Sequence, residues 1–232
     1  MPPNYPLRAA LSDATQRWHQ TITALADDDF AAPSGLPGWS RGHVIAHVAL
    51  NGEAFLRVLR LGAAEQPASM YDTAEGRDLD IDALASAAPA EIRARAIAVD
   101  EAISEALCAF PEQLLDAVAH RLPDGGGFAF ALREVPQRRL GEVEIHHADL
   151  GLATSSRAAW PVEFSELLLS ARTPGHRELR FTATDTDQTW GPDDAPVTLS
   201  GSSADLAWWL IGRGTGDGLT SSAGELPPTP TY

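Results

Sequence analysis

The sequence predicts an α+β protein in which a large helical N-terminal domain precedes a smaller C-terminal α/β domain. Two observations lead to this prediction. Up to about residue 154, long segments carry apolar residues at three- and four-residue spacing, which is the pattern of amphipathic helices. After Ala153, Ser and Thr become frequent, Pro recurs, and short alternating segments typical of strands follow. We therefore expect two domains, residues 1–154 and residues 155–232.

The first two predicted helices are joined by a connection that is rich in turn formers. Residues 7–26 place apolar side chains at helical spacing. The turn formers that follow are Pro33, Gly35, Pro37 and Gly38. Ser40 is then positioned to cap a second helix over residues 41–61, which ends at Gly62.

Two further helices complete the N-terminal domain. Residues 62–88 read as a long connector, and long loops in compact domains often shape a site. A third helix is predicted over residues 90–110 and a fourth over residues 135–152. The triple glycine at 125–127 lacks the Lys-Ser/Thr pair of a phosphate-binding loop, so we interpret it as a flexible connector. Four amphipathic helices with these connections predict an antiparallel bundle.

The C-terminal domain is predicted to mix short helices and strands. Residues 162–169 form a candidate helix, and residues 179–184 alternate as a strand does. Residues 188–190 and 197–200 are two more candidate strands, and residues 204–211 are a second candidate helix.

Composition narrows the function classes. The formal net charge is -15, which argues against nucleic acid and against an anionic membrane surface as partners. An anionic substrate would then need a local positive field from a metal ion or from placed arginines. The single cysteine, Cys108, excludes an internal disulfide and is compatible with a reducing compartment.

The absence of recognisable targeting segments also favours a reducing compartment. Residues 1–5 lack the basic and apolar regions of a secretory signal, and no apolar run approaches the roughly 20 residues of a membrane span. We therefore expect a cytoplasmic protein. The sequence does not decide between a monomer and a dimer.

The fourth predicted helix carries candidate metal ligands. Glu142 and His146 are four residues apart, so a helix places them one above the other on one face. Arg138 and Asp149 lie on the same face, beside the apolar stripe. Burying a carboxylate and an imidazole is costly unless they are partnered, and a metal ion is one solution.

The second predicted helix offers a third ligand. His47 lies between Val44 and Val48 on the inward side of the helix, and His43 sits one turn earlier. If the two helices pack side by side, His47, Glu142 and His146 can converge and leave a fourth coordination position open, as catalytic zinc sites do. A buried histidine without a metal, or a structural metal site closed by His43 or Asp149, remains an alternative.

Three motifs resemble a known family. They are Gly38-Trp-Ser-Arg-Gly-His43 followed by His47, Glu142 followed by His146-His-Ala-Asp-Leu-Gly151, and Leu206-Ala-Trp-Trp-Leu-Ile-Gly-Arg-Gly214. Together they resemble the mycothiol-dependent maleylpyruvate isomerase family, a branch of the DinB-like superfamily of metal-binding four-helix bundles. The resemblance covers most of the chain, and it is more specific for the family than for the substrate.

The resemblance implies a set of roles for particular residues. The family's metal triad would fall on His47, Glu142 and His146, with a single Zn²⁺. Arg77 and Arg213 match the two arginines that hold substrate and cosubstrate, and His43 would lie at the mouth of the site. Mycothiol would be the thiol cosubstrate.

The implied function is a cis-trans isomerase. The thiolate of mycothiol would add to the cis double bond of maleylpyruvate, a small anionic unsaturated acid, and leave to give fumarylpyruvate. Two alternatives stay open from the sequence. One is a mycothiol S-transferase that conjugates electrophiles on the same site, and the other is a non-catalytic bundle that binds a metal or a small molecule.

Overall fold

A computed structural model describes residues 7–230 of the chain. Residues 1–5, on which the expectation of no secretory signal depends, lie outside this range, as do the last two residues of the tail. The protein is a mixture of helices and small sheets, so the α+β class is confirmed. It forms two compact units, Met1–Ser155 and Ser156–Tyr232.

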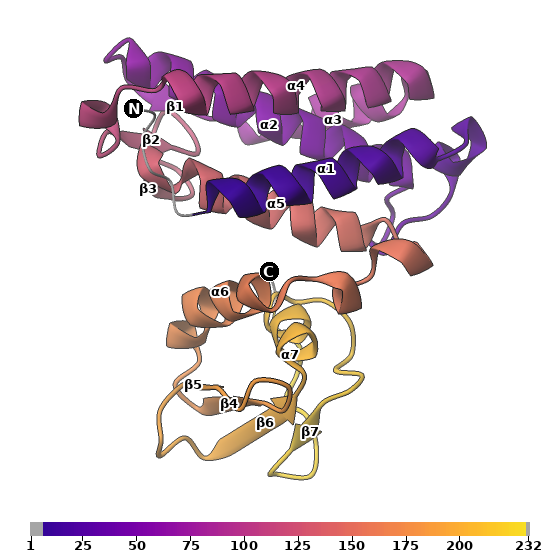
Figure 1. Ribbon diagram of the computed structural model, residues 1–232, viewed down its shortest axis with the longest axis vertical. Coiled ribbons are helices and arrows are strands. Elements are labelled where there is room, and N and C mark those ends of the chain that lie inside the picture. The colour runs from indigo at the N-terminus through magenta and orange to yellow at the C-terminus, as the bar shows by residue number, and fades with distance from the viewer. Residues whose placement is uncertain (1–6, 231–232) are drawn as a thin grey trace. The chain divides into compact units, whose positions relative to one another are not determined.

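The first unit is built mainly from helices (Figure 1). They are α1 (Arg8–Ala24), α2 (Arg41–Ala63), α3 (Ala74–Ala85), α4 (Pro89–Ala109) and α5 (Val135–Asp149). The α2 helix packs against α3, α4 and α5, while α1 packs along α5 and also meets α4. The α2 helix is therefore the centre of the unit, and its inward face supplies much of the apolar core, including Val44, Ile45, Val48, Phe55 and Leu59.

Side-chain caps fix where two of these helices begin. Ser40 Oγ accepts the backbone N–H of His43 at 3.3 Å, and His43 Nδ1 accepts the backbone N–H of Ser40 at 3.3 Å. This reciprocal pair satisfies two amide groups at the start of α2. In the same way, Thr73 Oγ1 accepts the N–H of Gly76 at 2.9 Å and begins α3.

The prediction that residues 62–88 form a connector is wrong in part. This segment contains α3 and the strand β1 (Ala68–Ser69). Only Ile81 and Leu84 of α3 are buried, so the helix has too few apolar residues to show a helical period in the sequence. The triple glycine belongs to the loop between β2 (Val118–His120) and β3 (Ala129–Ala131), two short strands that were also not predicted. In this sheet β1 pairs in parallel with β2, and β2 pairs antiparallel with β3.

A buried ion pair joins three helices of the first unit. Arg139 of α5 is 1% exposed, and its Nη2 donates to Asp100 Oδ1 of α4 at 2.7 Å. Its Nη1 donates to the carbonyl of Val48 at 2.8 Å and to Asn51 Oδ1 at 3.0 Å, both on α2. Burial opposes ionisation of Asp100, but Arg139 and a hydrogen bond from His19 hold the pKa of Asp100 below its ordinary value.

The end of α5 is tied to the loop that leads into α2. The N–H of Gly35 donates to the carbonyl of Asp149 at 2.7 Å, and Arg41 Nε donates to the carbonyl of Leu150 at 3.0 Å. Gly151 has a φ of 67°, the left-handed conformation that glycine adopts most readily after a helix. The two helices that carry His47, Glu142 and His146 are thus connected by hydrogen bonds at one end.

The second unit combines two helices with a four-stranded sheet. The helices are α6 (Val162–Arg172) and α7 (Ser203–Leu210), and they pack against each other. The sheet has the order β5 (Thr189–Trp190), β4 (Leu179–Ala183), β6 (Val197–Gly201) and β7 (Thr220–Ser221). The β4–β6 pair is parallel and the outer pairs are antiparallel. The predicted helices and strands of this region are present, with β7 as an addition.

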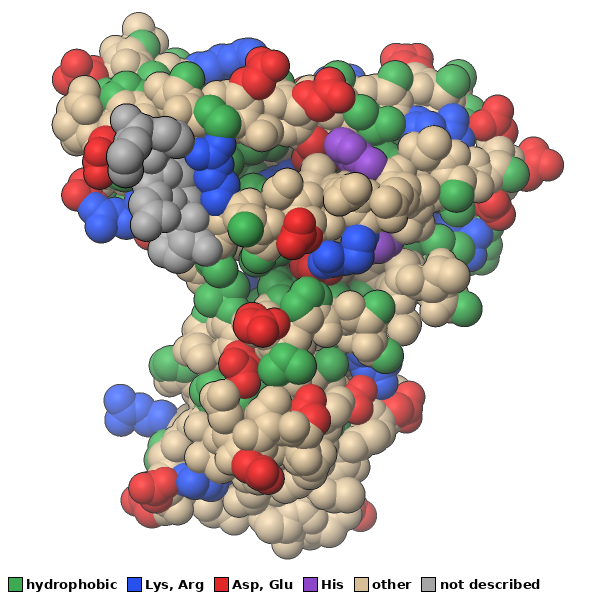
Figure 2. All heavy atoms as spheres, in the orientation of Figure 1, with side chains coloured by type: hydrophobic (Ala, Val, Ile, Leu, Met, Phe, Trp, Pro, Cys, Tyr) green, Lys and Arg blue, Asp and Glu red, His purple; other side chains and the backbone are tan. Residues whose placement is uncertain are grey.

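None of the helices in the described part of the chain is both long and apolar enough to span a membrane. On the face drawn in Figure 2, acidic and basic side chains are scattered over the first unit and form no continuous basic patch.

Candidate metal centre

His47, Glu142 and His146 meet at one point between α2 and α5. One ligand atom from each of the three lies within 4.8 Å of the other two. His47 Nε2 is 3.0 Å from His146 Nε2 and 3.2 Å from Glu142 Oε2. Both histidines are buried, at 6% and 9% exposure, while the Glu142 side chain is 27% exposed. The ligand atoms are therefore sheltered from water, while another part of the Glu142 side chain reaches solvent.

A chain of hydrogen bonds fixes the ring protons when both imidazoles are neutral. His146 Nδ1 lies 2.9 Å from the carboxylate of the buried Asp149, to which it donates. His146 Nε2 is then an acceptor and faces His47 Nε2. Arg77 Nη2 lies 3.1 Å from His47 Nδ1, and a guanidinium can only donate, so the proton of His47 is on Nε2.

The electrostatics favour the metal-binding protonation state for His47 and Glu142 but not for His146. Burial, followed by the neighbouring His146, lowers the pKa of His47 to about 4. Burial opposes ionisation of Glu142, but the two imidazoles hold its pKa well below the ordinary value. Burial lowers the pKa of His146, but Asp149 and Glu142 outweigh it and raise that pKa, so a proton and a metal ion would compete for this ring.

Glu142 supplies a direct test of whether the group fits a metal ion. Its Oε2 atom is buried and lies 3.2 Å from His47 Nε2 and 3.5 Å from His146 Nε2, but neither contact has hydrogen-bond geometry. A buried carboxylate oxygen without a hydrogen bond is costly. A divalent cation held by two imidazoles and this oxygen would satisfy it, and His146 already has the carboxylate behind it that orients metal-binding histidines. The residues present therefore fit a metal such as Zn²⁺.

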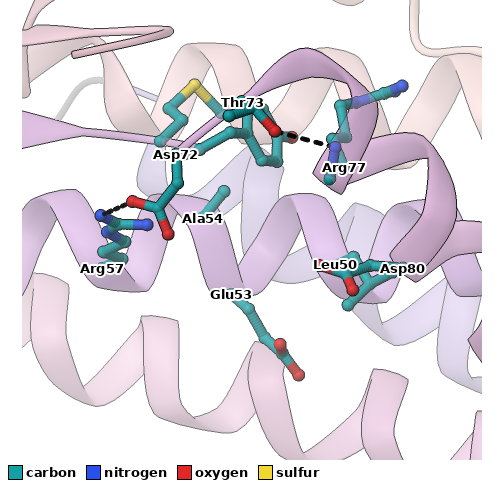
Figure 3. Close-up of a pocket in the computed structure, with 11 residues that line it drawn as sticks. Leu50, Glu53, Ala54, Arg57, Asp72, Thr73, Arg77 and Asp80 are labelled. Atoms are coloured by element: carbon teal, nitrogen blue, oxygen red, sulfur yellow. Dashed lines mark hydrogen bonds and ion pairs between the residues drawn. The ribbon is translucent and has the colours of Figure 1, made fainter.

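Arg77 and Tyr71 connect this group to a neighbouring cavity of about 330 Å³. The cavity lies between α2 and the start of α3 (Figure 3), and Arg77 and Tyr71 both line it. The Arg77 guanidinium is 5.7 Å from the centre of the Tyr71 ring. Burial, and next the charge of Glu142, raise the pKa of Tyr71, which keeps the phenol protonated at neutral pH.

Charged pairs surround the rest of the cavity. Arg57 donates to Asp72 at 2.6 Å, as Figure 3 shows, and Arg95 pairs with Glu53 at 2.5 Å. Arg77 also pairs with Asp78 at 2.6 Å. The apolar part of the wall comes from Leu50, Ala54 and Met70. The cavity can thus hold a small molecule that has both polar and apolar atoms.

Two other residues predicted for the site have contacts of their own. His43 contributes its Nδ1 to the cap of α2, with Ser40 Oγ at 2.8 Å, and its side chain is 30% exposed. Arg213 belongs to the second unit, where it follows α7 and its N–H donates to the carbonyl of Trp208 at 3.0 Å. The proposed roles of His43 and Arg213 in binding substrate or cosubstrate stay predictions.

Two neighbours of the triad on α5 make contacts away from it. Glu144 is buried and paired with Arg17, because α1 packs over that side of α5. Arg138 pairs with Glu134 at 3.0 Å, and its guanidinium lies over the rings of Phe128 and Phe130. Both are explained by packing within the unit.

Sequence reasoning missed Tyr71 as a site residue. The residue lies in the segment that was read as a connector, and its place beside Arg77 depends on pairing with the distant β2 strand. One feature of the sequence could have indicated it. Tyr71 lies shortly before Arg77, in a long segment that follows the helix predicted to carry the metal ligand His47. That signal is weak without knowledge of the pairing.

Comparisons with known proteins agree with the geometry. The family model described as the mycothiol maleylpyruvate isomerase N-terminal domain matches residues 11–151. No curated protein sequence matches the chain. A crystal structure of the mycothiol-dependent maleylpyruvate isomerase aligns with a TM-score of 0.87 and 24% identity, covering 99% of this chain and 98% of that one. A structure of a histidine-to-alanine mutant of that isomerase gives the same values.

The two kinds of comparison carry different conclusions. At 24% identity the likeness to the solved structures shows the fold, over nearly the full length of both chains. The family model covers more than half of the 232 residues and includes both helices that carry His47, Glu142 and His146. The chain therefore belongs to the family of the mycothiol maleylpyruvate isomerase N-terminal domain.

Proposed function

We propose that the protein is a metal- and mycothiol-dependent cis-trans isomerase that converts maleylpyruvate to fumarylpyruvate. The observation that carries the proposal is the convergence of His47, Glu142 and His146 around a carboxylate oxygen that lacks a hydrogen bond, next to a cavity lined by Arg77. Membership of the family and the fold likeness to the isomerase support the same reading.

The three ligands would hold Zn²⁺, which supplies the Lewis acidity that keeps a thiol as its thiolate at neutral pH. The chain's own residues provide the rest. Asp149 fixes the orientation of His146, and Arg77 places a guanidinium beside the triad, where it can pair with a substrate carboxylate. Arg213 would supply a second such group, and His43 would line the mouth of the site.

An open coordination position distinguishes this proposal from a purely structural metal site. Asp149 contacts Nδ1 of His146, the nitrogen opposite the one that faces the triad. His43 is engaged in the cap of α2. Neither belongs to the group of ligand atoms that meet at the centre, which supports a position free for a thiol.

We also infer that α1, α2, α4 and α5 form the antiparallel DinB-like four-helix bundle, since each packs against at least one of the others in the first unit. The two compact units support a domain boundary close to the one expected at residues 154 and 155.

The test is turnover by the purified full-length protein loaded with zinc, in the presence of mycothiol and maleylpyruvate. Fumarylpyruvate should form while the amount of free mycothiol stays constant. Net consumption of mycothiol, with accumulation of an adduct, would instead identify an S-transferase. Absence of both reactions would refute the proposal.

A pair of histidine variants tests the ligand assignment in the same assay. His47→Ala should lose bound metal and turnover together, whereas His176→Ala, a change in the second unit, should keep both. Metal content is measured by elemental analysis. Normal zinc binding by His47→Ala, or wild-type protein that holds less than about a tenth of an equivalent of metal, would contradict the assignment.

A further inference from the structure

We propose that Tyr71 is a catalytic residue whose hydroxyl binds the ketone oxygen of the substrate inside the 330 Å³ cavity and stabilises the enolate that forms there. The inference rests on the proposed isomerase function and adds to it the hydrogen-bond donor that stabilises the negative charge developing on the substrate oxygen. It also assigns the cavity beside Arg77 to the unsaturated keto acid.

The backbone of Tyr71 is held in place by strand pairing. The N–H of Met70 donates to the carbonyl of His120 at 2.9 Å, and the N–H of Tyr71 donates to the carbonyl of Arg121 at 3.1 Å. These bonds continue the parallel ladder between β1 and β2. The guanidinium groups of Arg77 and Arg121 lie 5.7 and 5.8 Å from the centre of the ring. Both the backbone and the ring are therefore positioned before any ligand arrives.

The groups next to the phenol leave its proton available. Arg77 and Asn51 lower the pKa of Tyr71 against burial and the charge of Glu142, as donors near a phenol oxygen do. Arg77 can only donate, and the Oδ1 atom of Asn51 accepts from the buried Arg139, so the amide N–H groups of Asn51 are the part of that side chain left to face Tyr71. With donors beside its oxygen, the phenol keeps its own O–H for an acceptor in the cavity.

The same chain of contacts links Tyr71 to the proposed ligands. Arg77 lies between them, since its Nη2 atom is 3.1 Å from His47 Nδ1 while its guanidinium rests over the Tyr71 ring. A molecule in the cavity can therefore reach Arg77 with a carboxylate and Tyr71 with a carbonyl oxygen. The volume lies at the lower end of the range for small-molecule pockets, which suits a small acid.

The reaction places a negative charge where this donor lies. As the cosubstrate thiolate adds, a carbon–sulfur bond forms and the carbon–carbon π electrons move to the conjugated ketone oxygen, giving an enolate. The former double bond is now single and rotates. The enolate electrons then return, the trans double bond forms, and the thiolate leaves, so no proton is gained or lost overall. A preorganised hydroxyl that donates to the enolate oxygen lowers the barrier of both steps.

The first test is the kinetics of Tyr71→Phe, which removes only the hydroxyl. We expect kcat to fall on the order of 100-fold, as for the loss of one oxyanion donor, with unchanged zinc content and an unchanged KM for mycothiol. Trp190→Phe, which removes an N–H that donates to Ser170 in the second unit, is the control and should retain wild-type kcat. A Tyr71→Phe enzyme with wild-type kcat would overturn the proposal.

The second test does not depend on turnover. Maleate, whose carboxylate oxygen stands in for the ketone oxygen, is titrated into the full-length protein while the near-ultraviolet tyrosine difference spectrum is recorded. The wild type should give a saturable signal that Tyr71→Phe lacks. Maleate binding without that signal, or no binding, would overturn the assignment of the cavity. If the wild type proved not to be an isomerase, the proposed function would fail, and this titration would still decide whether Tyr71 contacts the ligand.

Discussion

At the scale of single residues, the proton on His47 links metal binding to Arg77. In the hydrogen-bond chain described above, His47 Nδ1 accepts from Arg77 and Nε2 carries the proton. A metal ion at Nε2 requires the proton to be on Nδ1, which then cannot accept from a guanidinium. Metal binding and the Arg77–His47 hydrogen bond therefore exclude each other, and a bound metal would release Arg77 toward the cavity.

This exclusion gives a prediction for Arg77→Met. The variant should bind zinc more tightly, by roughly tenfold, because it loses a hydrogen bond of about 1.5 kcal/mol that competes with the metal and also a neighbouring positive charge. Turnover should fall at the same time. Affinity is measured by competition with a chromophoric zinc indicator.

Arg57→Met is the matched control for this measurement. It removes another guanidinium that lines the cavity, but its partner is Asp72 and not His47. Its zinc affinity should equal that of the wild type. Weaker zinc binding by Arg77→Met would mean that Arg77 supports His47 as a ligand, contrary to the argument.

Sequence reasoning reached the triad but not the residues that surround it. The spacing of Glu142 and His146 is a property of one helix, and the inward position of His47 follows from the apolar period of another. Both are local. Tyr71 and the acceptor role of His47 Nδ1 depend on contacts between segments that are far apart in the chain, which no local pattern encodes.

At the scale of elements, α5 is fixed to α2 and α4 by the buried pair of Arg139 and Asp100. Removing one member leaves the other charge buried and alone. Asp100→Ala should therefore lower the free energy of unfolding by about 3–5 kcal/mol, measured by denaturant titration. Because α5 carries Glu142 and His146, zinc affinity should fall as well.

Glu53→Ala gives the comparison for a pair at the surface. Glu53 and Arg95 are 38% and 42% exposed and pair at 2.5 Å. Water screens such pairs, so the loss should stay below about 1 kcal/mol. Equal losses for Asp100→Ala and Glu53→Ala would show that the buried pair does not hold the three helices together.

The elements themselves were predictable where their apolar period is strong. The segments that became α1, α2, α4 and α5 have several buried apolar positions each, and the sequence placed all of them. The α3 helix has two such positions, so its period could not be detected, and only its cap at Thr73 marks its start. Strands of two or three residues are likewise too short for an alternating pattern.

At the scale of the whole molecule, the division into two units predicts how they contribute to function. The triad lies within Met1–Ser155, whereas Arg213 lies within Ser156–Tyr232. A fragment of residues 1–155 should therefore fold and bind zinc with the affinity of the full chain, and its turnover should be lost if Arg213 holds the substrate. Circular dichroism and zinc titration measure the first part.

The single variant Arg213→Ala completes that experiment. It should keep the zinc content of the wild type and raise the KM for the acid by about 10–100-fold, as expected for the loss of a charged contact to a carboxylate. An unchanged KM would remove Arg213 from the site. A fragment of residues 1–155 that fails to fold would argue against two independent domains.

The composition change after Ala153 was the sequence signal for this boundary, and it reflects the replacement of long helices by short strands.

The hydrogen bonds that join the end of α5 to the loop before α2 have a consequence for how the cation is acquired. Gly35 and Arg41 bind the last carbonyls of α5, so the two ligand-bearing helices keep their spacing through the protein's own backbone. Small zinc-finger domains, in contrast, unfold when their zinc ion is removed. Here a strong chelator should remove the metal and leave the protein folded, and the empty site should then bind the same or another divalent ion. Which ion the site holds in a cell would therefore depend on which ions are available as well as on the fold.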